Sequence, residues 1–161
     1  MGNLGCCSID FAFDRSGRNH FVALFAAVNE STWEHLKLAF WPAIIFATIA
    51  YLIYFRKELN FCLAQAIKLF SMPAIIIILF YGWRYFFPDN FIYDISIFVL
   101  AVAVGHIFAY KIEAAKRDQG LKLPSAILIV LLLISFSLFT YFPLKSFLFQ
   151  DPVNGGYGIR S

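Results

Sequence analysis

The sequence predicts an all-α membrane protein, a polytopic membrane helix bundle with four transmembrane helices. Hydrophobic residues make up 61% of the 161 positions and charged residues only 14%, whereas a soluble domain carries roughly a quarter charged residues. The mean hydropathy is +0.73. Four apolar runs also reach the length of roughly 20 residues that a membrane-spanning helix needs. We therefore expect helices over about 32–55, 60–86, 91–116 and 122–147.

The first span begins within the stretch NESTWEHLKLAFWP, residues 29–42. Ser31 and Glu34 have the spacing of a capping box, in which each side chain accepts a hydrogen bond from the backbone N–H of the other residue. Glu30 and Glu34 also place negative charge at the positive end of the helix dipole. No charged residue follows between Leu38 and Phe55, so this run can cross a bilayer.

The second and third spans carry the few ionisable residues that interrupt apolar runs. Lys68 lies inside the second span and His106 well inside the third. Aromatic residues crowd the end of the second span around Arg84, as is typical of a membrane interface. Asp94 stands near the start of the third span. The fourth span is the least ambiguous, because residues 123–144 carry no charge.

The chain divides into three predicted parts, which are an extramembrane or interfacial segment (1–28), a transmembrane domain (29–147) and a C-terminal loop (148–161). Gly2, Cys6 and Cys7 partly match an acylation signal, and an ordinary N-terminus is the alternative. Basic residues gather in the loops at 56–59 and 111–122. The positive-inside rule then predicts cytoplasmic loops and outside termini in a multi-pass protein of the cell membrane.

Polar residues gather at the predicted outer ends of the helices, where they form a candidate ligand-binding site. Glu34 has an alternative structural role in the capping box, and Arg84 and Asp94 could pair across the ends of the second and third spans. No such role is evident for Glu30, His35 and Lys37, so we expect ligand contacts there first. The complete outer cluster consists of Glu30, Glu34, His35, Lys37, Arg84 and Asp94.

A second candidate site is an inner pocket formed by Thr48, Lys68 and His106. Lys68 and His106 are expected about 12 Å and about 15 Å from the inner ends of their helices, because an α-helix rises 1.5 Å per residue. An ionisable residue inside a span is costly unless it faces a partner or a water-filled cavity. The alternative for Lys68 is that its ammonium group reaches the inner surface.

The same arithmetic argues against a metal site formed by Glu34, His35 and His106, because His106 is expected on the order of 20 Å below His35. His35 does not belong to a His-Glu-x-x-His motif, and the three cysteines lack the spacing of a zinc site. No serine stands in a nucleophile motif. We therefore expect no metal and no cofactor, and the sequence identifies no catalytic residue.

Residues SGRNHFVALFAAV and NESTWEHLKLAFWP resemble a family of small, multi-spanning, mainly bacterial membrane proteins of unknown function that carry an NES-x-WEHLK motif. The tail FQDPVNGGYGI is similar as well, so the resemblance covers roughly residue 14 onward. It implies no activity and no catalytic residues. Family members carry a further spanning helix before the SGRN-like segment, whereas residues 1–13 are too short and polar for one. This implies a truncated or misread start, or a departure from the family.

The leading prediction is an uncharacterised integral membrane protein that binds a ligand, a lipid headgroup or a partner protein at its outer face through the NESTWEH segment, residues 29–35. One alternative is a membrane-embedded lipid hydrolase, metal-dependent or not, that uses Glu30, Glu34, His35 and Asp94. Another is a small transporter with an inner Lys68 and His106 pocket, for which a homo-oligomer could supply the pore. The lipid bilayer is the expected surrounding, and the small, dispersed net charge of +3 argues against nucleic acid.

Overall fold

The computed structural model describes residues 13, 15–55, 60–88, 90–115 and 121–159. Several predictions concern positions outside this range. They include acylation near Cys6 and Cys7, the proposed cytoplasmic loop at 56–59 and residues 116–120 of the loop at 111–122.

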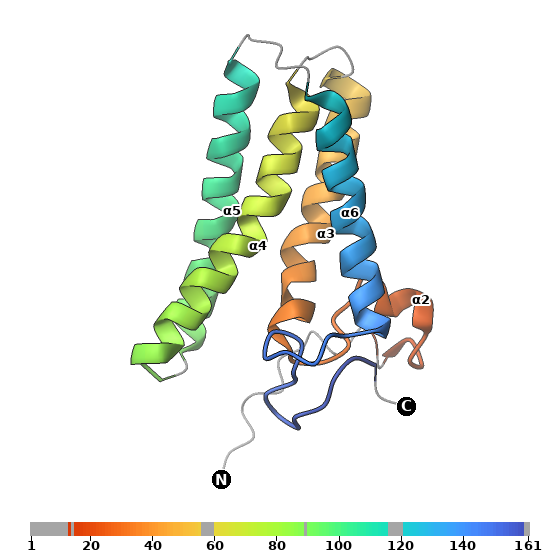
Figure 1. Ribbon diagram of the computed structural model, residues 1–161, viewed down its shortest axis with the longest axis vertical. Coiled ribbons are helices and arrows are strands. Elements are labelled where there is room, and N and C mark those ends of the chain that lie inside the picture. Colours follow the sequence, from red (N-terminus) through yellow and green to blue (C-terminus); the bar gives the residue numbers. More distant parts are fainter. Residues whose placement is uncertain (1–12, 14, 56–59, 89, 116–120, 160–161) are drawn as a thin grey trace. The chain divides into compact units, whose positions relative to one another are not determined.

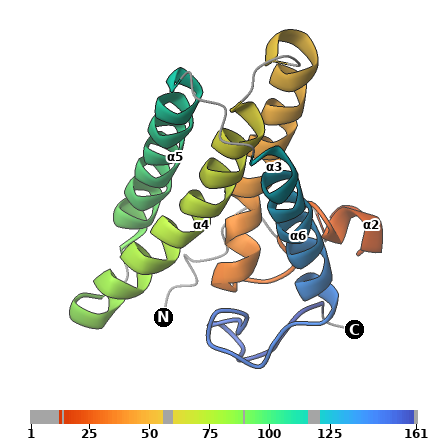
Figure 2. The same ribbon diagram turned by 45° about the horizontal axis from the view of Figure 1, so that its top comes forward.

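The described part of the chain is helical, and Figures 1 and 2 show its long helices. A short helix α2 (His20–Ala23) precedes α3 (Thr32–Ala50), which continues into a π-helical segment, Tyr51–Phe55. The remaining helices are α4 (Phe61–Phe86), α5 (Phe91–Ala114) and α6 (Lys122–Tyr141). Within the described residues four helices are long and apolar enough to cross a membrane. The predicted fold class is therefore confirmed.

The fourth spanning helix ends earlier than predicted. α6 stops at Tyr141 rather than near residue 147, and its last helical hydrogen bond runs from Phe142 N to Leu138 O at 2.9 Å. Pro143 follows directly. Because proline lacks a backbone N–H and disfavours helical geometry in the residue before it, helices usually stop at such a position.

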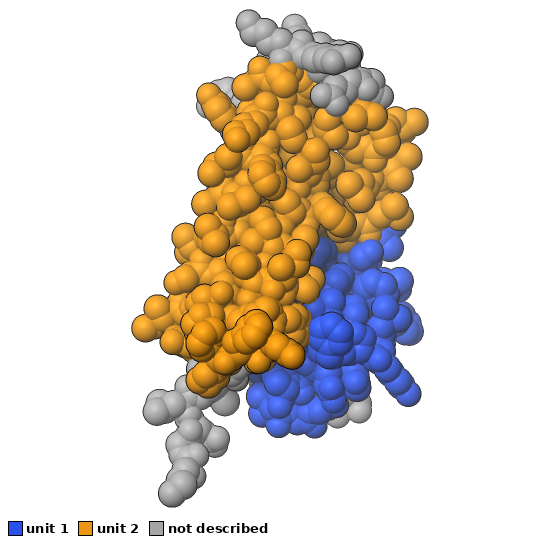
Figure 3. All heavy atoms as spheres, turned by 60° about the vertical axis from the view of Figure 1, so that its left-hand side comes forward, with its two compact units in different colours: residues 1–38, 134–161 blue, residues 39–133 orange. Residues whose placement is uncertain are grey.

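Figure 3 colours two compact units of the chain. Unit 1 comprises residues 1–38 and 134–161, and unit 2 comprises residues 39–133. Unit 1 thus joins segments from the two ends of the sequence. The predicted division into membrane and extramembrane parts at residues 28 and 147 remains a prediction.

In unit 2, α4 and α5 lie side by side along their length (Figures 1 and 2). α5 buries one residue on every fourth position, Ile97, Ala101, Gly105 and Ala109. Small residues at this spacing let two helices approach closely in a membrane. The approach is close at Gly105, where an added Cβ atom would lie 2.6 Å from Met72 Cγ.

The turn between α4 and α5 is held by aromatic stacking and by a cap. The Trp83 ring stacks on Phe87 and Tyr93, with ring centroids 4.3 Å and 3.8 Å away. The Asn90 side chain accepts a hydrogen bond from Ile92 N at 3.0 Å, so it satisfies one of the unpaired N–H groups at the start of α5. These contacts fix the antiparallel pairing of the two helices.

Candidate functional site

The start of α3 contains only half of the predicted capping box. Ser31 Oγ accepts a hydrogen bond from Glu34 N at 3.4 Å, as predicted. The reciprocal bond from Ser31 N goes instead to Asn29 Oδ1, at 2.9 Å. The Glu34 carboxylate is therefore not needed at Ser31, and it turns toward the interior of unit 1.

Glu34 and Lys37 form a buried ion pair in unit 1. Their exposed fractions are 2% and 0%, and Lys37 Nζ lies 2.8 Å from Glu34 Oε2. The same oxygen accepts a hydrogen bond from Val28 N at 3.1 Å. Glu34 Oε1 accepts another from Thr140 Oγ1 at 3.2 Å. A buried ion pair needs such additional hydrogen bonds to offset the free-energy cost of removing its charges from water.

Lys37 also donates a hydrogen bond to the backbone carbonyl of Ala23, at 3.0 Å. The expectation that Lys37 has no local structural role is thus wrong. Together, Glu34 and Lys37 connect α3 with the segment after α2 and with the end of α6. The ion pair therefore stabilises the packing of these segments within unit 1, and we call it the buried pair.

The other residues of the NESTWEH segment contact the C-terminal segment of unit 1. Asn29 Nδ2 donates to Gly158 O at 3.0 Å, and Trp33 N donates to Leu148 O at 3.0 Å. The Trp33 ring packs on Phe136 and Phe149, with ring centroids 4.6 Å and 4.8 Å away. The predicted C-terminal loop is therefore folded against the start of α3.

Asp151 organises the turn within that C-terminal segment. Its carboxylate accepts hydrogen bonds from Val153 N at 2.8 Å and from Asn154 Nδ2 at 2.5 Å. An antiparallel bridge between Gln150 and Tyr157 closes the turn. This arrangement brings Gly158 back to the end of α6.

Replacing Gly158 with alanine should destabilise unit 1 more than replacing Gly17. Both glycines have a positive φ, 64° and 69°, which costs a residue with a side chain about 1–2 kcal/mol. At Gly158 the new Cβ would also lie 2.9 Å from Pro143 Cγ, whereas nothing lies within 4 Å at Gly17. We expect this clash to add about 1–3 kcal/mol. Thermal unfolding of the two variants in detergent measures the difference, and equal losses would contradict it.

Glu30 and His35 remain partly accessible at the surface of unit 1. Their side chains keep 21% and 37% of their area exposed, and Glu30 Oε2 lies 3.4 Å from His35 Nε2. His35 Nδ1 lies 3.0 Å from Ser31 O. Since a carbonyl oxygen can only accept, Nδ1 carries the hydrogen. Nε2 then either carries a second proton and pairs with Glu30, or presents a lone pair beside the carboxylate.

The other two members of the predicted outer cluster, Arg84 and Asp94, belong to unit 2. The Arg84 guanidinium lies over the Phe80 ring, 4.3 Å from its centroid, a favourable cation–π geometry. Asp94 lies in the first turn of α5, where its negative charge favours the helix dipole. Their role in ligand binding remains a prediction, as it does for Glu30 and His35.

Lys68, from the predicted inner pocket, lies between α4 and α5 with an exposed fraction of 4%. It interacts electrostatically with Glu113 of α5. Gln65, one turn away on α4, donates a hydrogen bond from Nε2 to Glu113 Oε1 at 3.0 Å. We call these three residues the α4–α5 polar cluster. Gln65 and Glu113 are not among the residues predicted for either site.

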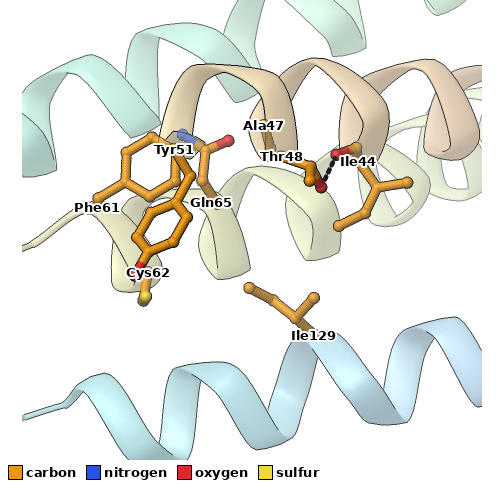
Figure 4. Close-up of a pocket in the computed structure, with 8 residues that line it drawn as sticks. All are labelled: Ile44, Ala47, Thr48, Tyr51, Phe61, Cys62, Gln65 and Ile129. Carbon is orange, nitrogen blue, oxygen red and sulfur yellow. Dashed lines mark hydrogen bonds between the residues drawn. The ribbon is translucent and has the colours of Figure 1, made fainter. Parts of the chain in front are cut away.

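Thr48 and His106 lie elsewhere in unit 2, and both are exposed. Thr48 Oγ1 donates to Ile44 O at 2.8 Å within its own helix, as Figure 4 shows. His106 Nδ1 lies 2.9 Å from Val102 O, also within its own helix. Of the three predicted pocket residues, Thr48 lines the cavity drawn in Figure 4, and Lys68 and His106 are not among the lining residues of that cavity.

Metal-binding groups are sparse in the part of the chain that the structure describes. Among those residues no three His, Cys, Asp or Glu side chains are placed to hold one metal ion. The residues of the hydrolase alternative are also divided, because Glu34 is bonded to Lys37 and Asp94 belongs to unit 2.

Comparison with known protein families gives one match over nearly the whole chain. The model of a family of unknown function, DUF6512, matches residues 3–159. The chain belongs to DUF6512. The match begins at residue 3, before residue 14, where the resemblance was expected to start. Neither the curated proteins nor the solved structures contain a match.

Membership of DUF6512 supports two statements. The chain is a membrane protein from a family of unknown function, and its described residues include four helices long and apolar enough to span a bilayer. Its family assigns no activity, so a function has to be argued from the site itself.

Proposed function

We propose that this DUF6512 protein binds an amine-bearing lipid headgroup at the outer boundary of the membrane through Glu30 and His35. The supporting observation is that the polar residues of the NESTWEH segment fall into a buried group and a partly accessible group. Asn29, Ser31 and Glu34 are buried and bonded within unit 1. Glu30 and His35 keep part of their side chains accessible.

The chemistry of the pair favours a hydrogen-bond donor. With the Nδ1 hydrogen directed at Ser31 O, a neutral His35 presents an acceptor at Nε2, 3.4 Å from the Glu30 carboxylate oxygen. Two neighbouring acceptors are stabilised by a shared donor, and a primary ammonium group has three N–H donors and a positive charge. Phosphatidylethanolamine carries such a group. The proposed outer location depends on the positive-inside count of the loops.

The buried residues of the segment would hold this pair in place. Ser31 O orients the His35 ring, and Asn29 Oδ1 fixes Ser31 N. A binding pair whose orientation is set by neighbouring hydrogen bonds loses less entropy when a ligand arrives.

The test compares two lipids that differ in their N–H groups. Phosphatidylethanolamine has three, and phosphatidylcholine carries the same charge without any. We expect native mass spectrometry of the detergent-purified protein to show retention of phosphatidylethanolamine in preference to phosphatidylcholine. Glu30→Gln should remove that preference, because it removes the charge that attracts the ammonium group.

The matched control is Glu113→Gln, which makes the same change in unit 2. It should leave the lipid preference intact. Equal retention of the two lipids by the unmodified protein, or an unchanged preference in Glu30→Gln, would rule out the proposal. The lipid hydrolase and the transporter remain alternative predictions.

A further inference from the structure

Unit 2 contains an open cavity on the helices that can cross the membrane. Its lining includes Ile44 and Ala47 of α3, Phe61 and Cys62 of α4, and Ile129 of α6 (Figure 4). The cavity volume is about 180 Å³. A single water molecule needs roughly 10–15 Å³ on the same measure, so the space admits a much larger group.

Two polar side chains beside this cavity direct their polar atoms elsewhere. Thr48 Oγ1 donates to Ile44 O, and Gln65 Nε2 donates to Glu113 Oε1. Gln65 Oε1 is completely buried against protein atoms, so it does not open on the cavity. Tyr51 and Cys62 also line the cavity and add a hydroxyl and a thiol, but most of the surface that an occupant would touch is carbon.

Water is an unfavourable occupant of such a space. A buried water molecule needs two to four polar partners, and apolar cavities of comparable size stay dry and take up apolar molecules. The occupant should thus be apolar as well.

The position of the cavity indicates which apolar molecule is available. The same helices that line it also expose apolar residues, namely Ile45, Phe46 and Ile49 of α3 and Ile127 and Val130 of α6. In a chain with four membrane-spanning helices this surface faces the hydrocarbon region. The group present there at high concentration is the acyl chain of the surrounding lipid.

We propose that the cavity is a binding site for an acyl chain of a membrane phospholipid. One chain enters from the lipid-facing surface between α3 and α6 and packs on Ala47, Phe61 and Ile129. The site belongs to unit 2 and does not depend on the headgroup proposal for Glu30 and His35.

The experiment uses the whole chain in phosphatidylcholine vesicles that contain a phosphatidylcholine with a photoactivatable diazirine in its acyl chain. After illumination, labelled peptides are mapped by mass spectrometry. We expect label on the lining residues of α3 and α4, including Ala47, which is only 6% exposed. The exposed face of α5 around Val99 should be labelled by bulk lipid and serves as the internal reference.

Ala47→Phe fills the cavity and should abolish label on its lining while the label near Val99 persists. Ala103→Phe makes the same change on the exposed face of α5 and should leave the cavity label unchanged. Ile129→Phe fills the space from α6 and replaces Ala47→Phe if that variant fails to fold.

Two results would overturn the proposal. The first is an unlabelled lining in the unmodified protein, and the second is a lining label that persists in both filled variants. Because phosphatidylcholine lacks N–H donors, neither result depends on the headgroup preference.

Discussion

Lys37→Met should destabilise the protein by about 3–5 kcal/mol, because it leaves the buried Glu34 carboxylate without its cation. Glu34 is 2% exposed, so water cannot replace the lost ammonium group. The backbone carbonyl of Ala23 also loses its donor. For a chain of this length the loss corresponds to a fall in melting temperature on the order of 10 °C. Thermal unfolding followed by size-exclusion chromatography in detergent measures it.

Two comparison variants separate the charge effect from the loss of the side chain. Lys145→Met removes an exposed lysine of unit 1 and should change the melting temperature little. The double variant Glu34→Gln/Lys37→Met removes both charges and keeps an acceptor for Val28 N or Thr140. It should be more stable than Lys37→Met alone. A double variant that is less stable would show that the buried pair does not act as a coupled unit.

The helical fold was predictable because a bilayer imposes length and apolarity on each span. All four expected helices are present, and the main error, at the end of α6, came from extending it past Pro143. Pro42 and Pro73 lie inside α3 and α4, as a membrane helix allows. Near the end of α6 the usual effect of proline as a helix terminator applies.

The contacts of the NESTWEH segment were less predictable, because the residues that it contacts are distant in sequence. Glu34 is bonded to Thr140, 106 positions away, and Asn29 to Gly158, 129 positions away. The one local signal was the i,i+3 spacing of Glu34 and Lys37 on a single helix face. Nothing in the sequence showed that the end of α6 and the C-terminal segment would cover that face and bury the pair.

For Lys68, the sequence contained evidence about its partner that the estimated depth of each residue in the membrane did not take into account. Two antiparallel helices joined by a short turn bring together residues at similar chain distances from the turn. This condition does not separate the two candidates, because Lys68 lies 18 residues before the end of α4 at Phe86, whereas Glu113 and His106 lie 22 and 15 residues after the start of α5 at Phe91. The spacing along α5 does separate them. Glu113 continues the four-residue spacing of the buried Ala101, Gly105 and Ala109, and His106 does not.

Gly105→Leu should disrupt the α4–α5 pair far more strongly than the same change at Gly82, the other described glycine of the two helices. A Cβ atom at this position already lies 2.6 Å from Met72 Cγ and 3.4 Å from Lys68 Cγ, and leucine adds three more carbons. Overpacking costs about 1–3 kcal/mol and occasionally more, and we expect a loss at or above the upper end. Gly82→Leu, on the same helix pair, has nothing within 4 Å of its Cβ and should be nearly neutral.

A second substitution, at Met72, should restore stability if the clash is the cause of the loss, and should not restore it if the protein is generally misfolded. Met72→Ala removes Cγ, the atom that the new side chain would meet, so Gly105→Leu/Met72→Ala should recover part of the lost stability. The α4–α5 polar cluster provides a second readout, because helix separation breaks the hydrogen bond from Gln65 to Glu113 and exposes Lys68. Reaction of Lys68 with an amine-specific reagent should therefore increase in Gly105→Leu and fall back in the double variant. If labelling stays constant while stability falls, the helices remain paired and close packing at Gly105 is not what keeps Lys68 buried.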